Sequence, residues 1–89
     1  MQFQFDPAKD GANIAKHGAS LVLALQLEWA SALIWTDSRH SYGETRQSAL
    51  GLVGERVYFV AFVDRGDVRR VISMRKANQR EAMFYAENS

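Results

Sequence analysis

Residues 46–75 read RQSALGLVGERVYFVAFVDRGDVRRVISMR, and this stretch decides the fold. It contains three runs typical of strands, at Arg46 to Leu52, Val57 to Val63 and Val68 to Arg75. Short links containing Gly54 and Gly66 separate the runs, and glycine readily adopts the positive φ that a tight hairpin needs. Links this short make the strands antiparallel neighbours. The middle run is apolar on both faces, so we expect a central strand with helices covering at least one side.

The residues at the start of the chain predict a short strand and a helix. Residues 2–5 alternate glutamine with phenylalanine, which fits a first strand or an extended lead-in. Asp6 is a preferred N-cap, and Pro7 suits the first helical position. We therefore expect a helix over residues 7–17 that ends at Gly18.

The next segment fits two structures. Large apolar residues occupy every second position, as in a strand, at Leu21, Leu23, Leu25, Leu27 and Trp29. Periodicity alone does not decide between a strand and a helix here. We predict a second helix over residues 21–29, because leucine and alanine favour helices and Ser20 can supply the cap.

Three further segments complete the expected elements. Residues 33–36 are a short strand candidate, and the polar run 37–45 is expected to be a loop. Asn78 and Glu81 have the spacing of a capping box, which predicts a last helix to about residue 87.

The expected architecture is a single α+β domain that covers residues 1–89. It has an antiparallel sheet of about four strands, two N-terminal helices and one C-terminal helix. A chain of 89 residues is too short for two cores. Its composition, 47% hydrophobic and 24% charged, is that of a globular protein and not of a disordered one.

The distribution of charge is more informative than its sum, which is a formal net charge of +1. Six of the eleven cations lie between Arg65 and Arg80, where Asp67 is the acid. The chain has no cysteine, which excludes disulfides and thiolate zinc sites and fits a cytoplasmic protein. His17 and His40 lack metal-ligand spacing. No signal peptide is expected, because an Asp-Pro pair precedes any apolar segment, and no apolar run is long enough to span a membrane.

Motifs along nearly the whole chain resemble the BrnT toxin family. The C-terminal signature is Ile72-Ser73-Met74-Arg75 followed by Ala77, Glu81 and Tyr85, with Met74 where the family usually has Ala. The other matching motifs, in chain order, are Phe5-Asp6-Pro7, Lys9, Asn13, Lys16-His17-Gly18, His40-Ser41, Gly43-Glu44 and Arg46. The resemblance implies a RelE-like fold and a ribonuclease toxin of a type II toxin–antitoxin pair. It also implies a BrnA-like antitoxin whose ribbon-helix-helix domain binds DNA, so that the toxin meets DNA only through the complex.

RNA cleavage without a metal or another cofactor needs three kinds of group. A base activates the 2′-hydroxyl, cations hold the scissile phosphate, and an acid protonates the leaving oxygen. His17 titrates nearest neutral pH, and the end of a helix favours its cationic form. The alternative is that His17 caps the last carbonyls of its helix.

Arginines on the last strand and beside the loop are candidate phosphate ligands. Strict alternation places Arg69, Val71, Ser73 and Arg75 on one face and Val68, Arg70, Ile72 and Met74 on the other. Arg75 lies at the strand end beside a helix N-terminus, which makes it the best clamp candidate, and its alternative is a surface ion pair. Arg46 is a second candidate, and its alternative is a salt bridge with the nearby Glu44.

The remaining candidates have structural alternatives of their own. Glu81 fits the family's acid but also completes the capping box. Tyr85 lies four residues later and can stack on a base or pack in the core, and packing is the better interpretation. Ser73 has no partner that would activate it as a nucleophile, so we expect its hydroxyl to contact a phosphate or the backbone. Trp29 and Trp35 are expected in the core.

These considerations give two groups of site residues. The candidate catalytic residues are His17, Glu44, Arg46, Arg75 and Glu81. The candidate RNA-binding residues are Lys9, Lys16, Arg70, Ser73, Lys76, Arg80 and Tyr85.

The sequence supports a metal-independent endoribonuclease toxin that inhibits translation. The competing hypothesis is a non-catalytic module that uses the same basic surface to bind a partner or a nucleic acid. A DNA-binding regulator is a weaker hypothesis, because no recognition helix with a run of base-reading side chains is evident.

Overall fold

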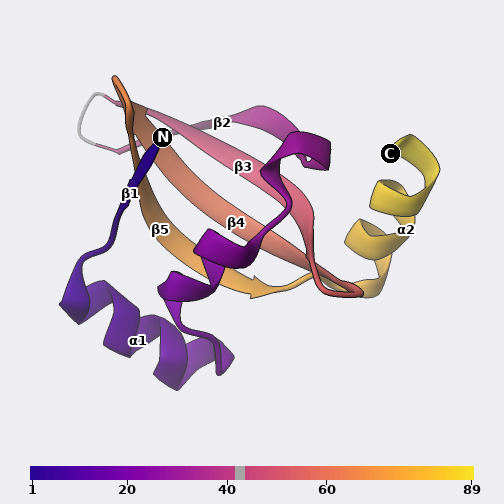
Figure 1. Cartoon of the computed structure of the whole chain (residues 1–89), viewed down its shortest axis with the longest axis horizontal. Coiled ribbons are helices and arrows are strands. Elements are labelled where there is room, and N and C mark those ends of the chain that lie inside the picture. The colour runs from indigo at the N-terminus through magenta and orange to yellow at the C-terminus, as the bar shows by residue number, and fades with distance from the viewer. Residues whose placement is uncertain (42–43) are drawn as a thin grey trace.

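The computed structural model describes residues 1–41 and 44–89 and shows an α+β fold built on one five-stranded sheet. The strands are β1 (Gln2–Gln4), β2 (Leu33–Ser41), β3 (Glu44–Val53), β4 (Arg56–Arg65) and β5 (Val68–Lys76). The helical elements are α1 (Pro7–His17), the 3₁₀ segments η1 (Leu21–Gln26) and η2 (Trp29–Ser31), and α2 (Gln79–Asn88). The strand order is β1-β5-β4-β3-β2 (Figure 1).

The three central strands form the expected antiparallel meander. Gly54 and Gly66 occupy the two hairpin turns with φ of 62° and 58°, as the sequence predicts. β4 lies in the middle of the sheet, and Val60, Ala61 and Phe62 are fully buried in it. The strand order confirms the prediction that this apolar run is the central strand.

The sheet is larger than expected and is not purely antiparallel. β1 pairs in parallel with β5, through Gln2 opposite Val68 and Gln4 opposite Arg70. The loop prediction for residues 37–45 is wrong, because β2 continues to Ser41 and β3 begins at Glu44. Pairing between these two strands overrides the polar, turn-like composition of the segment. The predicted turn residue Gly43 lies outside the described residues.

The predicted second helix is instead two short 3₁₀ segments. Leu21, Ala24 and Leu27 are buried at a spacing of three residues, which is the period of a 3₁₀ helix. Ser20 caps the segment as expected, through an Oγ that accepts a hydrogen bond from the amide of Val22 (3.2 Å). Burial against the sheet therefore determines the conformation of this segment, and intrinsic helix propensity does not.

α1 begins and ends where the sequence predicts. The carboxylate of Asp6 accepts a hydrogen bond from the amide of Ala8, and Gly18 ends the helix with φ of 70°. Asn13, within the helix, is buried at 6% exposure. Its Nδ2 donates to the carbonyls of Ala19 and Met74 (both 2.7 Å), and its Oδ1 accepts from the amide of Met74 (3.1 Å). Asn13 thus ties α1 to the stretch of β5 that lies beyond its pairing with β1.

Replacing this amide should destabilise the fold strongly. We expect Asn13→Ala to lower the free energy of unfolding by about 2–4 kcal/mol, because the buried amide and carbonyl of Met74 lose their partner. Urea unfolding measures the effect. Lys16→Ala, an exposed change on the same helix, is the control and should unfold like the parent. Equal stability of all three proteins would contradict this role for Asn13.

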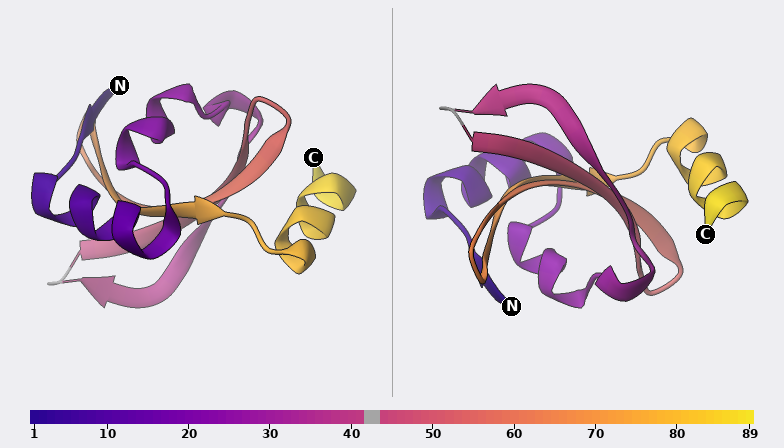
Figure 2. Two further views of the ribbon diagram at one scale, coloured as in Figure 1. Left: turned by 90° about the horizontal axis from the view of Figure 1, so that it is seen from below. Right: turned by 90° about the horizontal axis from the view of Figure 1, so that it is seen from above.

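The sheet has two faces of different character. The core face is covered by η1, which packs on Ala49, Val60, Phe62, Val71 and Met74. We use the term outer face for the opposite side, which carries Arg46, Ser48, Ala61, Ser73 and Arg75. Figure 2 shows the sheet bending around the 3₁₀ segments, with α2 following the end of β5.

A bulge in β5 changes the predicted facing of its arginines. Ala61 pairs with Ser73 but Phe62 pairs with Val71, so β5 has one extra residue. Strict alternation is therefore wrong for this strand. Arg69 faces the core, with its guanidinium carbon 4.4 Å from the centre of the Trp29 ring, whereas Arg70 joins Ser73 and Arg75 on the outer face.

None of the helices described for residues 1–41 and 44–89 is both long and apolar enough to cross a membrane.

Candidate functional site

The outer face of the sheet carries three arginines beside small side chains. Ser48, Ala61 and Ser73 lie opposite one another on β3, β4 and β5 and form a floor without bulky groups. Arg46 precedes Ser48 by two residues on β3, so both side chains leave the same face of the sheet. Arg70 and Arg75 lie on β5 on either side of Ser73. β3 and β5 thus contribute to one polar surface, which we call the arginine face: Arg46, Ser48, Arg70, Ser73 and Arg75.

Arg46 has unused hydrogen-bonding capacity. Its side chain is 23% exposed, and its Nε is buried with no hydrogen-bond acceptor among the described residues. The carboxylate of Asp37 on β2 lies 3.8 Å from this Nε, which is an ion pair but too long for a hydrogen bond. A buried donor without an acceptor carries a desolvation cost, and the nearby carboxylate offsets that cost only in part.

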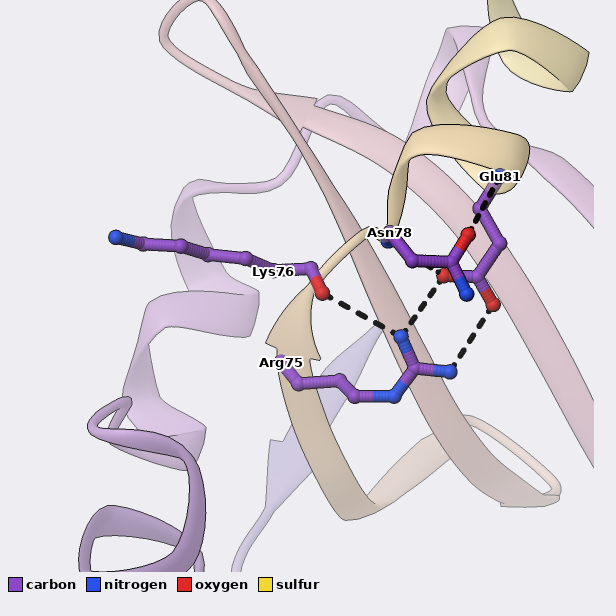
Figure 3. Close-up of polar contacts among 4 residues, drawn as sticks. All are labelled: Arg75, Lys76, Asn78 and Glu81. Atoms are coloured by element: carbon purple, nitrogen blue, oxygen red, sulfur yellow. Dashed lines mark hydrogen bonds and ion pairs between the residues drawn. The ribbon is translucent and has the colours of Figure 1, made fainter.

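Arg75 is held by a two-pronged ion pair with Glu81 of α2 (Figure 3). Its Nη1 and Nη2 donate to the two carboxylate oxygens at 2.8 Å and 3.0 Å. Glu81 also accepts from the amide of Asn78, which in turn caps α2 and completes the predicted capping box. The pair therefore fixes the start of α2 at the end of β5.

The ion pair sets the protonation of Glu81. The hydrogen bonds from Arg75 lower the pKa of the Glu81 carboxyl, and the bond from the Asn78 amide acts in the same direction. The same pairing raises the pKa of Arg75. Because the pKa of Glu81 is depressed in the folded state, its stabilising contribution is complete above the ordinary glutamate pKa and is lost as the pH falls through the lowered value.

Glu44 is paired with Arg65, whereas the sequence suggested Arg46. Arg65 Nη2 donates to Glu44 Oε1 at 2.6 Å, and hydrogen bonding from Arg65 lowers the pKa of Glu44. Arg70 adds a smaller electrostatic contribution in the same direction, which agrees with its place on the arginine face. Arg70 also lies 3.9 Å from Asp6, in a longer ion pair.

Three candidates lie on α1, which packs against β5 but is not part of the arginine face. Lys9 and Lys16 are exposed, and His17 is half-buried in the last turn. At the C-terminal end of α1, the backbone amide of Gly18 donates a hydrogen bond to the carbonyl of Ile14. Within the part of the chain that the structure describes, no hydrogen bond joins His17 to the arginine face.

The remaining candidates occupy the end of β5 and α2. Lys76 is exposed, and its carbonyl accepts from Arg75 Nη1 at 3.4 Å. Arg80 is exposed at the start of α2. Tyr85 is only 6% exposed and its hydroxyl reaches the carbonyl of Ser31, which supports the packing interpretation over base stacking.

Two residues of this surface escaped the sequence analysis. Asp37 was assigned to a loop, although its strand position opposite an arginine could have been suggested by charge pairing. Trp35 was expected in the core but is 41% exposed on the outer face, where its ring centre lies 6.3 Å from that of Phe59. Trp29 does pack against the core, with its ring edge on Phe62.

The arginine face has the chemistry of an oxyanion site. Guanidinium groups and hydroxyls donate hydrogen bonds in directions that suit phosphate oxygens. Glu44 and Glu81 stay ionised near neutral pH, so neither can serve as a proton donor there. Its guanidinium and hydroxyl groups make the arginine face a candidate site for a phosphate or another oxyanion.

Comparison with known proteins gives one assignment. A family model described as the ribonuclease toxin BrnT of type II toxin–antitoxin systems matches residues 5–81. No curated protein matches the chain.

Proposed function

The chain belongs to the BrnT family of ribonuclease toxins from type II toxin–antitoxin systems, and from this premise we propose that it is a metal-independent endoribonuclease acting at the arginine face. The observation that best supports this location is the grouping of Arg46, Arg70 and Arg75 around the small floor of Ser48 and Ser73. Cations in such an arrangement suit the charge that grows on a phosphate during cleavage.

The reaction proposed is attack of a ribose 2′-oxygen on the adjacent phosphorus. The bond from phosphorus to the 5′-oxygen breaks, which leaves a 2′,3′-cyclic phosphate on one product and a 5′-hydroxyl on the other. Arg46 and Arg75 hold non-bridging phosphate oxygens, and Ser73 donates a hydrogen bond to the same group. Their attraction strengthens as the phosphate gains charge, and this preference for the transition state is what accelerates the reaction.

Proton transfer requires a base for the 2′-hydroxyl and an acid for the 5′-oxygen. Glu44 and Glu81 are acceptors weakened by their arginine partners. We propose that His17 accepts the proton of the 2′-hydroxyl, since histidine is the side chain that most often performs such transfers, and that solvent water gives a proton to the departing 5′-oxygen. RNA that contacts both Arg75 and His17 would cross the edge of β5 against which α1 packs. Lys9, Lys16, Lys76 and Arg80 would then contact the flanking phosphates.

The biological setting follows from the family. We propose a RelE-like toxin of the cytoplasm, silenced by a BrnA-like antitoxin that carries a ribbon-helix-helix DNA-binding domain. An acidic antitoxin segment would complement the arginines and would associate faster at low salt. The toxin itself would meet DNA only in that complex.

Expression in bacteria tests this proposal. Induced synthesis of the chain alone should arrest growth and reduce incorporation of labelled amino acids, because RNA needed for translation is cut. Co-expression of the antitoxin should restore both. Normal growth in cells that contain the soluble protein would contradict the toxin function.

A further inference from the structure

A groove lies between α2 and the outer face of β2 and β3, beside the arginine face. Its volume is about 670 Å³, within the range typical of small-molecule sites. The apolar part of its lining comes from Leu33, Ile34, Trp35 and Leu50 of the sheet and Phe84 of α2. Arg80 and Asn88 are the polar residues of α2 that line it, together with Glu81.

The groove and the arginine face are linked through Glu81. Glu81 lines the groove and binds Arg75 through both carboxylate oxygens. The Arg75 guanidinium carbon lies 4.4 Å from the centre of the Phe59 ring, and Phe59 contacts Trp35. Trp35 also precedes Asp37, the ion-pair partner of Arg46, by two residues on β2, a spacing of about 6.6 Å along a strand.

The lining suits a flat, partly polar ring better than an aliphatic ligand. Trp35 and Phe84 are 41% and 48% exposed, so both aromatic rings can be covered by a ligand. Arg80 presents hydrogen-bond donors. Asn88 uses its Nδ2 on the carbonyl of Phe84, which leaves its side-chain oxygen as an acceptor. Single-stranded RNA is recognised by this combination of aromatic stacking and hydrogen bonds to the base edge.

We propose that this groove is a nucleobase subsite, in which an unpaired RNA base next to the scissile phosphate stacks on Trp35 while Arg80 and Asn88 contact its edge. The inference rests on the proposed ribonuclease function, since it places the phosphate of the same nucleotide on the arginine face. Glu81 then has a second role, because it positions both Arg75 and the helix that forms one wall of the subsite.

Binding of a short RNA that cannot be cut tests the subsite separately from catalysis. A fluorescent 2′-O-methyl oligonucleotide serves as the probe, and fluorescence anisotropy gives the dissociation constant. We expect Trp35→Ala to raise that constant by roughly five- to a hundredfold, the range typical of one lost base stack. Trp35→Phe, which keeps an aromatic face, should recover most of the affinity. Met83→Ala changes an exposed apolar residue of α2 outside the groove and is the matched control.

The possible outcomes separate this proposal from the function on which it rests. Weaker binding by Trp35→Ala with recovery in Trp35→Phe supports the subsite, even if the parent fails to cut ordinary RNA and the ribonuclease proposal falls. Equal dissociation constants for the parent and Trp35→Ala overturn the subsite. This holds also if Trp35→Ala no longer forms a complex with the antitoxin, because the groove would then bind the antitoxin and not RNA. A parent that neither binds nor cuts RNA overturns both proposals.

Discussion

Arg46→Ala is expected to lower the rate of RNA cleavage by about a hundred- to a thousandfold while the protein stays folded. The side chain of Arg46 is 23% exposed at the arginine face, and no bidentate carboxylate partner is described for it, in contrast to Arg75. Loss of one such donor group from a preorganised site typically has an effect of this size. Its ion pair with Asp37 is long and partly exposed, so we expect the free energy of unfolding to change by less than about 1 kcal/mol.

Two further variants make the Arg46 result specific. Arg46→Lys keeps the charge but loses the planar fork, and it should cleave at an intermediate rate. Arg56→Ala removes an exposed cation at the start of β4, near the β3–β4 turn, and should behave as the parent does. Initial rates on a labelled RNA, together with thermal unfolding, measure these effects. Parent-like cleavage by Arg46→Ala would exclude this residue from the site.

Arg75→Ala should reduce cleavage by about a hundredfold, because it removes a second charged contact to the phosphate. The structure gives this residue a competing role, since Glu81 occupies both of its terminal nitrogens. Glu81→Gln separates the two roles. This change weakens the interaction of Arg75 with α2, but the Arg75 guanidinium remains and its positive charge is no longer balanced by a carboxylate.

The two interpretations of Arg75 predict different pairs of results. If Arg75 binds the phosphate, Arg75→Ala cleaves poorly and Glu81→Gln retains most of the cleavage rate. If Arg75 only anchors α2, both variants lose a similar amount of unfolding free energy and cleave at similar rates. Single-turnover rates and urea unfolding on the same preparations distinguish these cases.

Local signals in the sequence predicted the elements whose ends depend on a few neighbouring residues. Asp6 and Gly18 bound α1, Gly54 and Gly66 turn the hairpins, and Asn78 caps α2, each through the contact that its residue type favours. The errors arose where distant segments decide the conformation. Residues 37–41 form a strand because they pair with β3. η1 is a 3₁₀ helix because two of its residues and its C-cap residue, at a spacing of three, are buried against the sheet.

The site was predictable by residue type and not by geometry. Arg46, Arg70 and Arg75 were candidates from the sequence, but the bulge in β5 that puts Arg70 and Arg75 on one face has no local signature. Pairing partners also depend on register, so Glu44 pairs with Arg65 and Arg46 with Asp37. The aromatic groove was missed because apolar composition suggests burial, whereas Trp35 lies on an uncovered part of the outer face.

The central claim is that the arginine face cuts RNA by 2′-hydroxyl attack, and the chemistry of the cut ends tests it most directly. The purified chain should be incubated with an end-labelled RNA in excess EDTA, and the products analysed by mass spectrometry. We expect cleavage that is unchanged by EDTA, fragments ending in a 2′,3′-cyclic phosphate, and partner fragments beginning with a 5′-hydroxyl. Intact RNA, cleavage that stops when divalent ions are removed, or fragments with 5′-phosphates would contradict the mechanism.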